Sequence, residues 1–508
     1  MSTLTSRWVA RAGDSGVAVL DGRGPHSHDD VIAGSLRVAS ALLHAAGRGS
    51  LEGQRVAILV GPSAAFVEAF FGVLLAGGCV VVLSPLHPAP ETRYFCDDAG
   101  VRTVLVSAEL RELAAPLAAT LEIRDLEPIL ATDEPPFDLG PLADDAPALQ
   151  LYTSGTTGKP KGAVITHANL AVQQQLVGQA WGFGEADTLL HALPLHHMHG
   201  LAIALLTALG AGATTHLTTF DALTLWDAMS AATVFMGVPA IYHRLLGAFD
   251  AADEQTRRRW SANARQLRLA TSGSAALPVT LATRWQAIAG RIPLERFGMT
   301  EIGVGITNVL DGERYPGCVG FPLPTVETRI VGDDGQVAAL GELWIRGPSV
   351  FAGYHNRAQE TRDAFATDPD GGAAWFKTGD TVTRDDAAGS PAPFKILGRT
   401  SVDILKSGGY KLSALEIEEV LREHPAVGEV AVIGLPDEAW GERVVACVVR
   451  KESGGACDAV ILRAFAKERL ASYKVPKDVL FLDDLPKNAL GKVVKTALLA
   501  QMKDAKRA

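Results

Sequence analysis

One loop rich in glycine, threonine and lysine guides the interpretation of this sequence: Tyr152-Thr153-Ser154-Gly155-Thr156-Thr157-Gly158-Lys159-Pro160-Lys161-Gly162. Short runs at 148–151 and 163–166 predict a strand on each side, and a helix is expected from about Ala168. The three glycines allow tight turns that present backbone N–H groups, while hydroxyls and two lysines add donors and positive charge. The loop is therefore predicted to bind a polyphosphate.

This loop is not an ordinary P-loop, which reads GxxxxGK followed by Ser or Thr and a helix. Here only two residues separate Gly155 from Gly158, and Pro160 follows Lys159. Proline has no N–H to donate, so the backbone donor of a P-loop helix start is missing. The alternative to a phosphate-binding loop is a flexible surface turn.

The composition indicates a globular protein with more than one domain. The chain has 508 residues, of which 47% are apolar and 20% charged, so a large core is expected. The net charge of −10 argues against a nucleic-acid-binding surface. Five scattered cysteines without a CxxC pair favour free thiols in a reducing compartment.

No segment has the length and apolarity of a membrane span. The most apolar window, 201–213, is too short to cross a bilayer and contains two glycines. Residues 1–10 hold no long apolar run, so no secretory signal is expected. We therefore expect a cytoplasmic protein. Arg7 and Arg11 precede the first acidic residue, which keeps a transit peptide and the mitochondrial matrix open as an alternative.

Apolar runs separated by a helical pattern predict a parallel sheet early in the chain. Strands are expected at 55–60, 79–83 and 103–106, with a helix over 64–76, as is typical of parallel strands covered on both faces. Further strands are expected at 188–195, 214–218, 233–238 and 267–270. Runs at 328–331 and 342–345, with an Asp-Asp-Gly turn between them, predict a β-rich subdomain up to about Gly398.

Beyond Arg399 the pattern predicts a compact α+β unit. Helices are expected at 414–423, 458–471 and 493–503, and strands at 429–433, 443–449 and 479–482. The predicted fold class is α/β, with a large N-terminal domain of several subdomains (1–398) and a small α+β C-terminal domain (399–508). The boundary is expected between Gly398 and Gly409, where glycine and polar residues replace the apolar pattern.

Five stretches that look like strand-end loops occur in a fixed order: the glycine-rich loop, 272–278, 295–301, 378–380 and 486–492. In this order they resemble the adenylate-forming superfamily of acyl-CoA synthetases, over roughly residues 55–499. The resemblance implies that a carboxylate attacks ATP to give acyl-AMP and pyrophosphate, and that the CoA thiol then displaces AMP. It also implies Mg²⁺ as cofactor and a mobile C-terminal domain that rotates between the two half-reactions.

The resemblance assigns an ATP site. Its phosphate cradle would comprise Thr153, Ser154, Gly155, Thr156, Thr157, Gly158, Lys159 and Lys161. Thr300 and Glu301 would bind phosphate and Mg²⁺, with Thr156 as a further metal ligand; a carboxylate suits this hard ion. Asp380 would bind the ribose, Arg399 the nucleotide, and Ser274, Ala275 and Phe297 would surround the adenine. Alternatively, Glu301 caps a helix or pairs with a lysine, and Thr378-Gly379-Asp380 is an ordinary turn.

Lys492, in Pro486-Lys487-Asn488-Ala489-Leu490-Gly491-Lys492, resembles the adenylation lysine of the superfamily. A mobile point charge is suited to bridging the carboxylate and the α-phosphate; the alternative is an exposed lysine without a role. Acetylation of this lysine in the family would neutralise it and implies a lysine acetyltransferase as a partner. Gly408 and Gly409 resemble the loop that lines the pantetheine tunnel, and Ser401 and Val402 are both candidates for the hinge.

The run His196-His197-Met198-His199 invites a zinc hypothesis, but no other Cys or His lies at a structural-zinc spacing. In the family this motif lines the acyl pocket, with His199 gating the path between the acyl and CoA sites.

Arg296 is predicted to select the carboxylate substrate. It lies at the expected acyl pocket, where a buried cation needs an anionic partner. A dicarboxylate offers a second carboxylate, which arginine can hold bidentately. Arg244 is a second candidate clamp, or else a solvated arginine on a helix face; Met198 and Met299 would form pocket walls, or simply fill the core. The alternative for Arg296 is a local pair with Glu295 or a surface contact.

Strings 194–197, 272–278 and 295–301, supported by 400–406, most resemble the malonyl-CoA synthetases of this superfamily. The resemblance implies conversion of malonate or methylmalonate, with ATP and CoA, to the acyl-CoA, AMP and pyrophosphate. A synthetase for another small or medium carboxylate, an enzyme that loads a carrier-protein thiol, and a non-catalytic nucleotide-binding relative are the alternatives. The joint presence of Lys159, Glu301, Asp380, Arg399 and Lys492 argues against the last.

Overall fold

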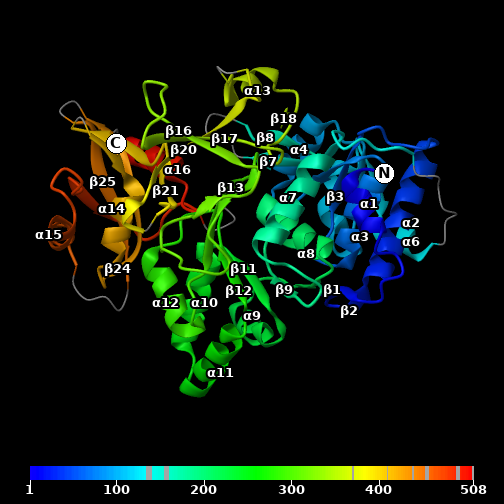
Figure 1. Cartoon of the computed structure of the whole chain (residues 1–508), viewed down its shortest axis with the longest axis horizontal. Coiled ribbons are helices and arrows are strands. Elements are labelled where there is room, and N and C mark those ends of the chain that lie inside the picture. The colour runs from blue at the N-terminus through cyan, green and yellow to red at the C-terminus, as the bar shows by residue number, and fades with distance from the viewer. Residues whose placement is uncertain are drawn as a thin grey trace.

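The computed structural model describes residues 1–132, 140–153, 159–368, 371–388, 390–408, 410–437, 440–451, 457–487 and 492–505, with side chains to residue 502. Within these residues the strands form four sheets (Figure 1). Helices of the larger part are α1 (Thr3–Val9), α2 (His28–Ala46), α3 (Ala64–Leu75), α4 (Ala89–Ala99), α5 (Arg111–Ala114), α6 (Leu126–Ala131), α7 (His167–Ala180), α8 (Leu206–Gly210), α9 (Ala222–Ala228), α10 (Pro239–Ala251), α11 (Glu254–Arg265), α12 (Val279–Ala289) and α13 (Ala358–Ala364).

A seven-stranded sheet contains the predicted strand–helix–strand unit, in the order β18-β8-β7-β4-β3-β5-β6. Its strands are β3 (Arg55–Leu59), β4 (Cys79–Val82), β5 (Thr103–Val106), β6 (Glu122–Asp125), β7 (Pro147–Thr153), β8 (Lys161–Thr166) and β18 (Gly353–Tyr354). β3 pairs in parallel with β4 and β5, as their continuous apolar runs require. The predicted parallel sheet is confirmed. The glycine-rich loop joins β7 to its antiparallel neighbour β8.

Helix α7 begins where predicted because the sequence supplies its cap. The Thr166 side chain accepts from the Asn169 N–H, and the Asn169 side chain accepts in return from the Thr166 N–H. This reciprocal arrangement satisfies backbone donors that the first helical turn leaves free.

A nine-stranded sheet, in the order β15-β14-β13-β12-β11-β9-β10-β1-β2, forms the second layer. Its strands are β1 (Val17–Asp21), β2 (Gly24–Ser27), β9 (Thr188–His191), β10 (Thr214–Leu217), β11 (Val234–Gly237), β12 (Leu269–Ser272), β13 (Leu294–Met299), β14 (Gly303–Thr307) and β15 (Phe321–Pro322). The strand predicted over 188–195 ends already at His191. The Leu193 N–H donates to His191 Nδ1 at 3.2 Å, and Pro194 has no N–H to continue a sheet ladder.

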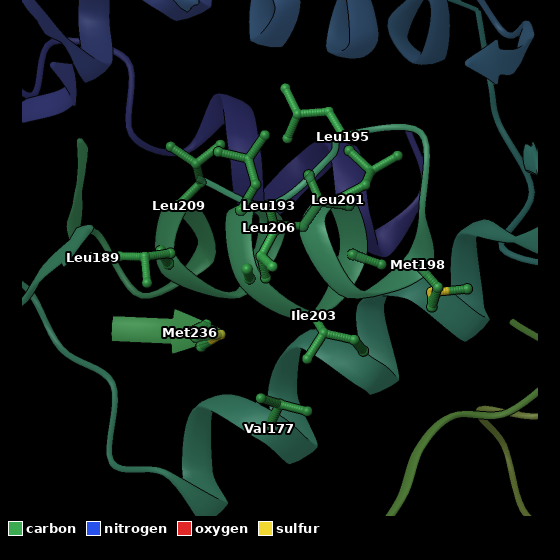
Figure 2. Packing of buried hydrophobic residues seen from close by; sticks show 14 of the residues in the cluster. Val177, Leu189, Leu193, Leu195, Met198, Leu201, Ile203, Leu206, Leu209 and Met236 are labelled. Carbon is green, nitrogen blue, oxygen red and sulfur yellow. The ribbon is translucent and has the colours of Figure 1, made fainter. Parts of the chain in front are cut away.

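The apolar window 201–213 belongs to the core. A π-helical segment, His199–Leu205, leads directly into α8, and Leu201, Ile203 and Leu206 are buried there against Val177 and Met236 (Figure 2). Among the described residues, no helix has the length and apolar character needed to cross a bilayer.

The predicted hairpin material forms an antiparallel sheet of β16 (Glu327–Val331), β17 (Leu340–Arg346), β19 (Phe365–Ala366), β20 (Trp375–Arg384) and β21 (Phe394–Arg399). Beyond it lie β22 (Ile404–Ser407), β23 (Tyr410–Ser413), α14 (Ala414–Arg422), β24 (Val427–Asp437), β25 (Gly441–Arg450), α15 (Ala459–Arg469), β26 (Asp478–Phe481) and α16 (Lys495–Ala505). Sheet membership changes between Arg399 and Ile404. The last unit lies at the opposite end from the N-terminus (Figure 1). The predicted fold class, a large α/β part with a small α+β part, is confirmed.

Candidate functional site

Glu301 is buried beside groups that come from distant parts of the chain. It follows β13 and is 5% exposed. The Tyr354 hydroxyl, from β18, donates to Glu301 Oε1 at 2.8 Å, and Lys161 Nζ, from the neighbouring strand β8, lies 5.4 Å from the centre of the Tyr354 ring. Burial raises the pKa of Glu301, while the Tyr354 hydroxyl and the charges of Arg399 and Lys161 oppose that rise.

Asp380 lies on β20, opposite Arg399 on the antiparallel partner β21. Arg399 Nε is 3.3 Å from Asp380 Oδ1, and Arg399 Nη1 donates to the Thr378 carbonyl at 2.8 Å. Burial raises the pKa of Asp380 to about 6, against the opposing charges of Arg399 and Lys492. The predicted adenylation lysine therefore lies near the predicted ribose aspartate, and Arg399 acts on both Asp380 and Glu301.

The structure describes only the ends of the glycine-rich loop. Ser154, Gly155, Thr156, Thr157 and Gly158 lie outside the described residues. Thr153 ends β7, Lys161 begins β8, and Lys159 Nζ lies 5.3 Å from the centre of the Tyr94 ring. The Tyr94 hydroxyl also donates to the Pro160 carbonyl at 2.7 Å. Thr153 and Lys161 face each other across the strand pair. The pairing of β8 with β18 then places Lys161 near Tyr354, the partner of Glu301.

Arg296 is 6% exposed, and its Nε and Nη2 atoms have no hydrogen-bond partner among the described residues. Burial lowers the pKa of Arg296 to about 10. The guanidinium crosses Gly273 so closely that a Cβ at that position would be 2.4 Å from Arg296 Cζ. A buried cation with two unsatisfied donors is costly unless an anion reaches it.

His199 faces the same place. Its Nδ1 is 3.2 Å from the Ser274 hydroxyl, while its Nε2 is buried without a partner among the described residues. Burial and the neighbouring Arg296 charge hold the pKa of His199 well below its usual range, so the imidazole is neutral. Ser274 adopts φ +67°, a left-handed conformation that side chains seldom take. The strained turn directs its hydroxyl to His199.

Glu295 does not pair with Arg296. Consecutive residues of β13 point to opposite faces, and Glu295 Oε1 accepts from the Gly317 N–H at 2.8 Å. Burial raises the pKa of Glu295 to about 8. The local ion pair considered as an alternative role for Arg296 is therefore absent from the contacts of the described residues.

The other predicted pocket residues lie near this point, with one exception. Phe297 and Met299 are partly buried along β13, Thr300 follows them, and Met198 is buried at the start of the π-helical segment (Figure 2). Ala275 is exposed in the turn after Ser274.

Arg244 is the exception. It is exposed on α10, with its guanidinium carbon 4.0 Å from the centre of the Phe220 ring. These contacts favour the solvated helix-face alternative, because a long side chain gains by covering an aromatic ring while its charge stays in water.

The predicted thioester loop and hinge lie in the last unit and at its border. Gly408 adopts φ +58° and donates its N–H to the Trp440 carbonyl at 2.8 Å; Gly409 lies outside the described residues. At the border, the Val402 and Asp403 N–H groups both donate to the Arg399 carbonyl, at 3.1 and 2.8 Å. Ser401 and Val402 thus lie in one tight turn, and the hinge assignment stays a prediction.

Among the described residues, no group of three or more His, Cys, Asp or Glu side chains is arranged to hold a metal ion. His196 and His197 lie with their ring centres 4.2 Å apart, and burial lowers their pKa values to about 3 and 4.

Two features of the site were missed by sequence reasoning. Tyr354 belongs to a strand of two residues, too short to produce a pattern. Lys495 lies between the buried Glu418 and the partly buried Asp403, with Nζ 2.6 Å from both Asp403 Oδ1 and Glu418 Oε1. Asp403 also accepts from the Arg399 N–H at 3.0 Å, so this ion cluster connects Arg399 to the segment after Lys492. The sequence indicated this ion cluster only by placing charged residues within otherwise apolar runs.

Cations from three segments of the chain lie near two buried acids. Lys161, Arg399 and Lys492 surround Glu301 and Asp380, and such an arrangement can stabilise a polyanion while offering oxygen ligands to a cation or to hydroxyls. The buried guanidinium of Arg296, which lies beside His199 and has two donors without a partner among the described residues, can bind a further anion.

Comparison with known proteins identifies the family. The model of the AMP-binding enzyme family matches residues 6–355, and that of the AMP-binding enzyme C-terminal domain matches residues 416–492. The chain belongs to the AMP-binding enzyme family. This membership confirms the predicted relationship to the adenylate-forming superfamily and the prediction that the chain is an enzyme.

Relatives of this AMP-binding enzyme align over most of its length. It is 38% identical to the mitochondrial malonate–CoA ligase ACSF3 of Bos taurus over 533 aligned residues, covering 96% of this chain and 88% of the relative. It is 37% identical to a malonate–CoA ligase of Arabidopsis thaliana, covering 89% of this chain and 78% of the relative. The crystal structure of ATP-bound MatB from Rhodopseudomonas palustris superimposes with a TM-score of 0.88 at 33% identity, covering 99% of each chain.

Proposed function

We propose that this AMP-binding enzyme is an ATP-dependent malonate–CoA ligase, which forms malonyl-CoA, AMP and pyrophosphate through an acyl-adenylate. The observation that carries the proposal is the buried guanidinium of Arg296, which has two donors without a partner among the described residues and lies beside a neutral His199. The relatives named malonate–CoA ligase support the same substrate.

A second carboxylate on the substrate explains Arg296 better than a monocarboxylate does. Once the reacting carboxylate of a monoacid is activated, nothing remains to neutralise the guanidinium, and an unpaired buried charge costs several kcal/mol. Malonate or methylmalonate would place its distal carboxylate against Nε and Nη2. The Nε2 atom of His199 is buried, has no partner among the described residues and is available for a further contact with the substrate. Met198 and Met299 then bound the pocket and limit it to short acids.

The proposed roles of the remaining residues follow from the resemblance of their motifs to the family. We infer that Lys492 moves to the reacting carboxylate and α-phosphate, while Thr153, Lys159, Lys161 and the undescribed residues between them hold the β- and γ-phosphates. Asp380 accepts from the ribose hydroxyls, Arg399 contacts the nucleotide, and Phe297, Ser274 and Ala275 enclose the adenine. Residues 399–508 form the mobile domain, with Gly408 and Gly409 on the CoA path.

Glu301 offers a hard oxygen ligand near Lys161, which suits Mg²⁺. Thr300 precedes it in the chain, and Thr156, which lies outside the described residues, is the further ligand that we propose. When bound, Mg²⁺ would neutralise phosphate charge. Acetylation of Lys492 stays a prediction. It would remove the positive charge that opposes the rise in the pKa of Asp380.

The test is pyrophosphate exchange with malonate, methylmalonate, succinate and acetate, followed by measurement of CoA dependence. We expect exchange with malonate, and the Arg296→Ala variant to lose about 3 kcal/mol of transition-state stabilisation with malonate, roughly 100-fold, since two charge-assisted hydrogen bonds disappear. Arg244→Ala is the matched control and should leave exchange unchanged, because that arginine is exposed over Phe220.

A second variant separates the clamp from general damage. Gly273→Ala introduces a Cβ 2.4 Å from Arg296 Cζ, so it should displace the guanidinium and lower malonate exchange while acetate exchange persists. Equal losses on malonate and acetate would overturn the clamp. Absence of exchange with any acid would favour a nucleotide-binding protein, and exchange without CoA dependence would favour loading of a carrier thiol.

A further inference from the structure

Helix α12 lacks a side-chain cap of its own. Its N-cap residue is Pro278, which has no side-chain acceptor, so the first turn leaves backbone N–H groups unpaired. The Val279 N–H donates instead to Oε1 of Glu419 at 2.7 Å. Glu419 lies on α14, in the last unit of the chain, 140 residues away. Figure 1 shows α14 beside the end of α12.

The Glu419 carboxylate is held in place for this contact. Arg422, one turn further along α14, donates from Nη1 to the other oxygen, Oε2, at 3.0 Å. The carboxylate therefore bridges its own helix and the positive N-terminus of α12, where a negative charge is favoured. The geometry resembles a helix cap that is supplied by another part of the chain.

Helix α12 begins directly after the turn that lines the acyl pocket. That turn contains Gly273, which lies under Arg296, and Ser274, which contacts His199. Lys492, which belongs to the same unit as Glu419, lies near Asp380. Glu419 thus ties the unit that carries Lys492 to the segment that shapes the pocket.

Other contacts across this border are different in kind. Ser413 Oγ donates to the Leu397 carbonyl at 2.6 Å, next to the border turn in sequence, and Lys411 forms an ion pair with Asp333 on a surface loop. Neither of these contacts reaches the pocket turn.

We propose that Glu419 is a positioning residue, which docks the last unit onto α12 in the orientation that holds Lys492 beside Asp380. This inference rests on the proposed adenylation chemistry but not on the identity of the acid. Loss of the contact should slow the step that needs Lys492 and spare the step in which CoA displaces AMP.

The experiment compares Glu419→Ala and Glu419→Gln with Glu416→Ala in the full chain. Glu416 is the matched control, since it lies on the same helix but pairs with Lys474 within the same unit. Adenylation is measured by pyrophosphate exchange, with whichever acid the wild type activates. Thioester formation is measured by AMP release from the isolated acyl-adenylate and CoA.

We expect Glu419→Ala to slow exchange about fivefold, the size of effect that a lost helix cap supports, with AMP release unchanged. Glu419→Gln keeps an acceptor oxygen and should recover part of the rate, and Glu416→Ala should match the wild type. Equal slowing of both half-reactions, or exchange unchanged in Glu419→Ala, would overturn the proposal.

Amide exchange gives a second readout that does not depend on activity. The Val279 N–H should lose protection in Glu419→Ala and keep it in Glu416→Ala. A Val279 amide that stays protected in Glu419→Ala would show that the cap does not form, whatever the enzyme activates. A wild type inactive with malonate but active with another acid would count against the proposed substrate alone.

Discussion

Replacement of Lys495 by methionine should weaken the last unit of the chain more than any single surface change. Lys495 is 9% exposed, and its Nζ lies 2.6 Å from both Asp403 and Glu418. Burial opposes its charge, but Glu418 and Asp403 outweigh this effect and raise the pKa of Lys495. Methionine fills similar space but removes the cation that lies between Glu418 and Asp403.

The expected loss of unfolding free energy depends on which partners Glu418 and Asp403 keep in the variant. Breaking a buried ion pair from one side costs about 3–5 kcal/mol. Glu418 retains the Val432 N–H at 2.8 Å and Arg422 at 3.2 Å, and Asp403 retains the Arg399 N–H at 3.0 Å. We therefore expect a loss near the lower end of that range, about 3 kcal/mol.

The pH dependence provides the sharper test. In the wild type, the raised lysine pKa means that its stabilisation is fully present below the unfolded pKa of about 10.4, so it is constant between about pH 5 and 9. In the variant, Glu418 and Asp403 face each other without the lysine between them. Two ionised carboxylates in that position repel each other, so the penalty applies where both are charged. The loss should therefore be largest near pH 8 and smaller near pH 5.

The assay is urea unfolding followed by amide exchange in α14 and β24, at both pH values. Lys474→Met is the control, since its pair with Glu416 is more exposed and such pairs contribute little. A loss below about 1 kcal/mol, or one that is the same at pH 5 and pH 8, would refute the reasoning.

Two further predictions concern single contacts. Tyr354→Phe removes the hydroxyl that donates to Glu301. Pyrophosphate exchange should therefore fall about tenfold, since a hydrogen bond to a charged group contributes about 1.5 kcal/mol. In the control Tyr94→Phe, the lost hydroxyl donates to a neutral carbonyl, so exchange should fall less; an equal fall in both variants would count against the role of Tyr354. Burial raises the pKa of Glu68 to about 7, so the folded state disfavours its ionised form and loses stability as pH rises from about 4.5 to 7. In thermal unfolding, Glu68→Gln should gain on the wild type between pH 5 and pH 8, and a constant difference would contradict this.

Short-range patterns determined much of this protein. The apolar runs of β3, β4 and β5 require a sheet that is covered on both faces, and Thr166 with Asn169 fixes the start of α7. The order of the five motifs was enough to predict the family, because each motif is a short local sequence whose chemical role can be inferred from its own residues.

The tertiary structure alone decided which of these groups meet. Tyr354 reaches Glu301 across 53 residues, and Glu419 reaches Val279 across 140. No periodicity records such contacts, because each depends on how separate sheets and helices stack. The sequence could place Arg296 and Arg244 in the same list of candidates, but only burial distinguished them. The guanidinium of Arg296 is buried and has two donors without a partner among the described residues, whereas that of Arg244 is exposed over the Phe220 ring. Desolvation is a property of the whole fold, and it is what turned a charged residue into a candidate substrate clamp.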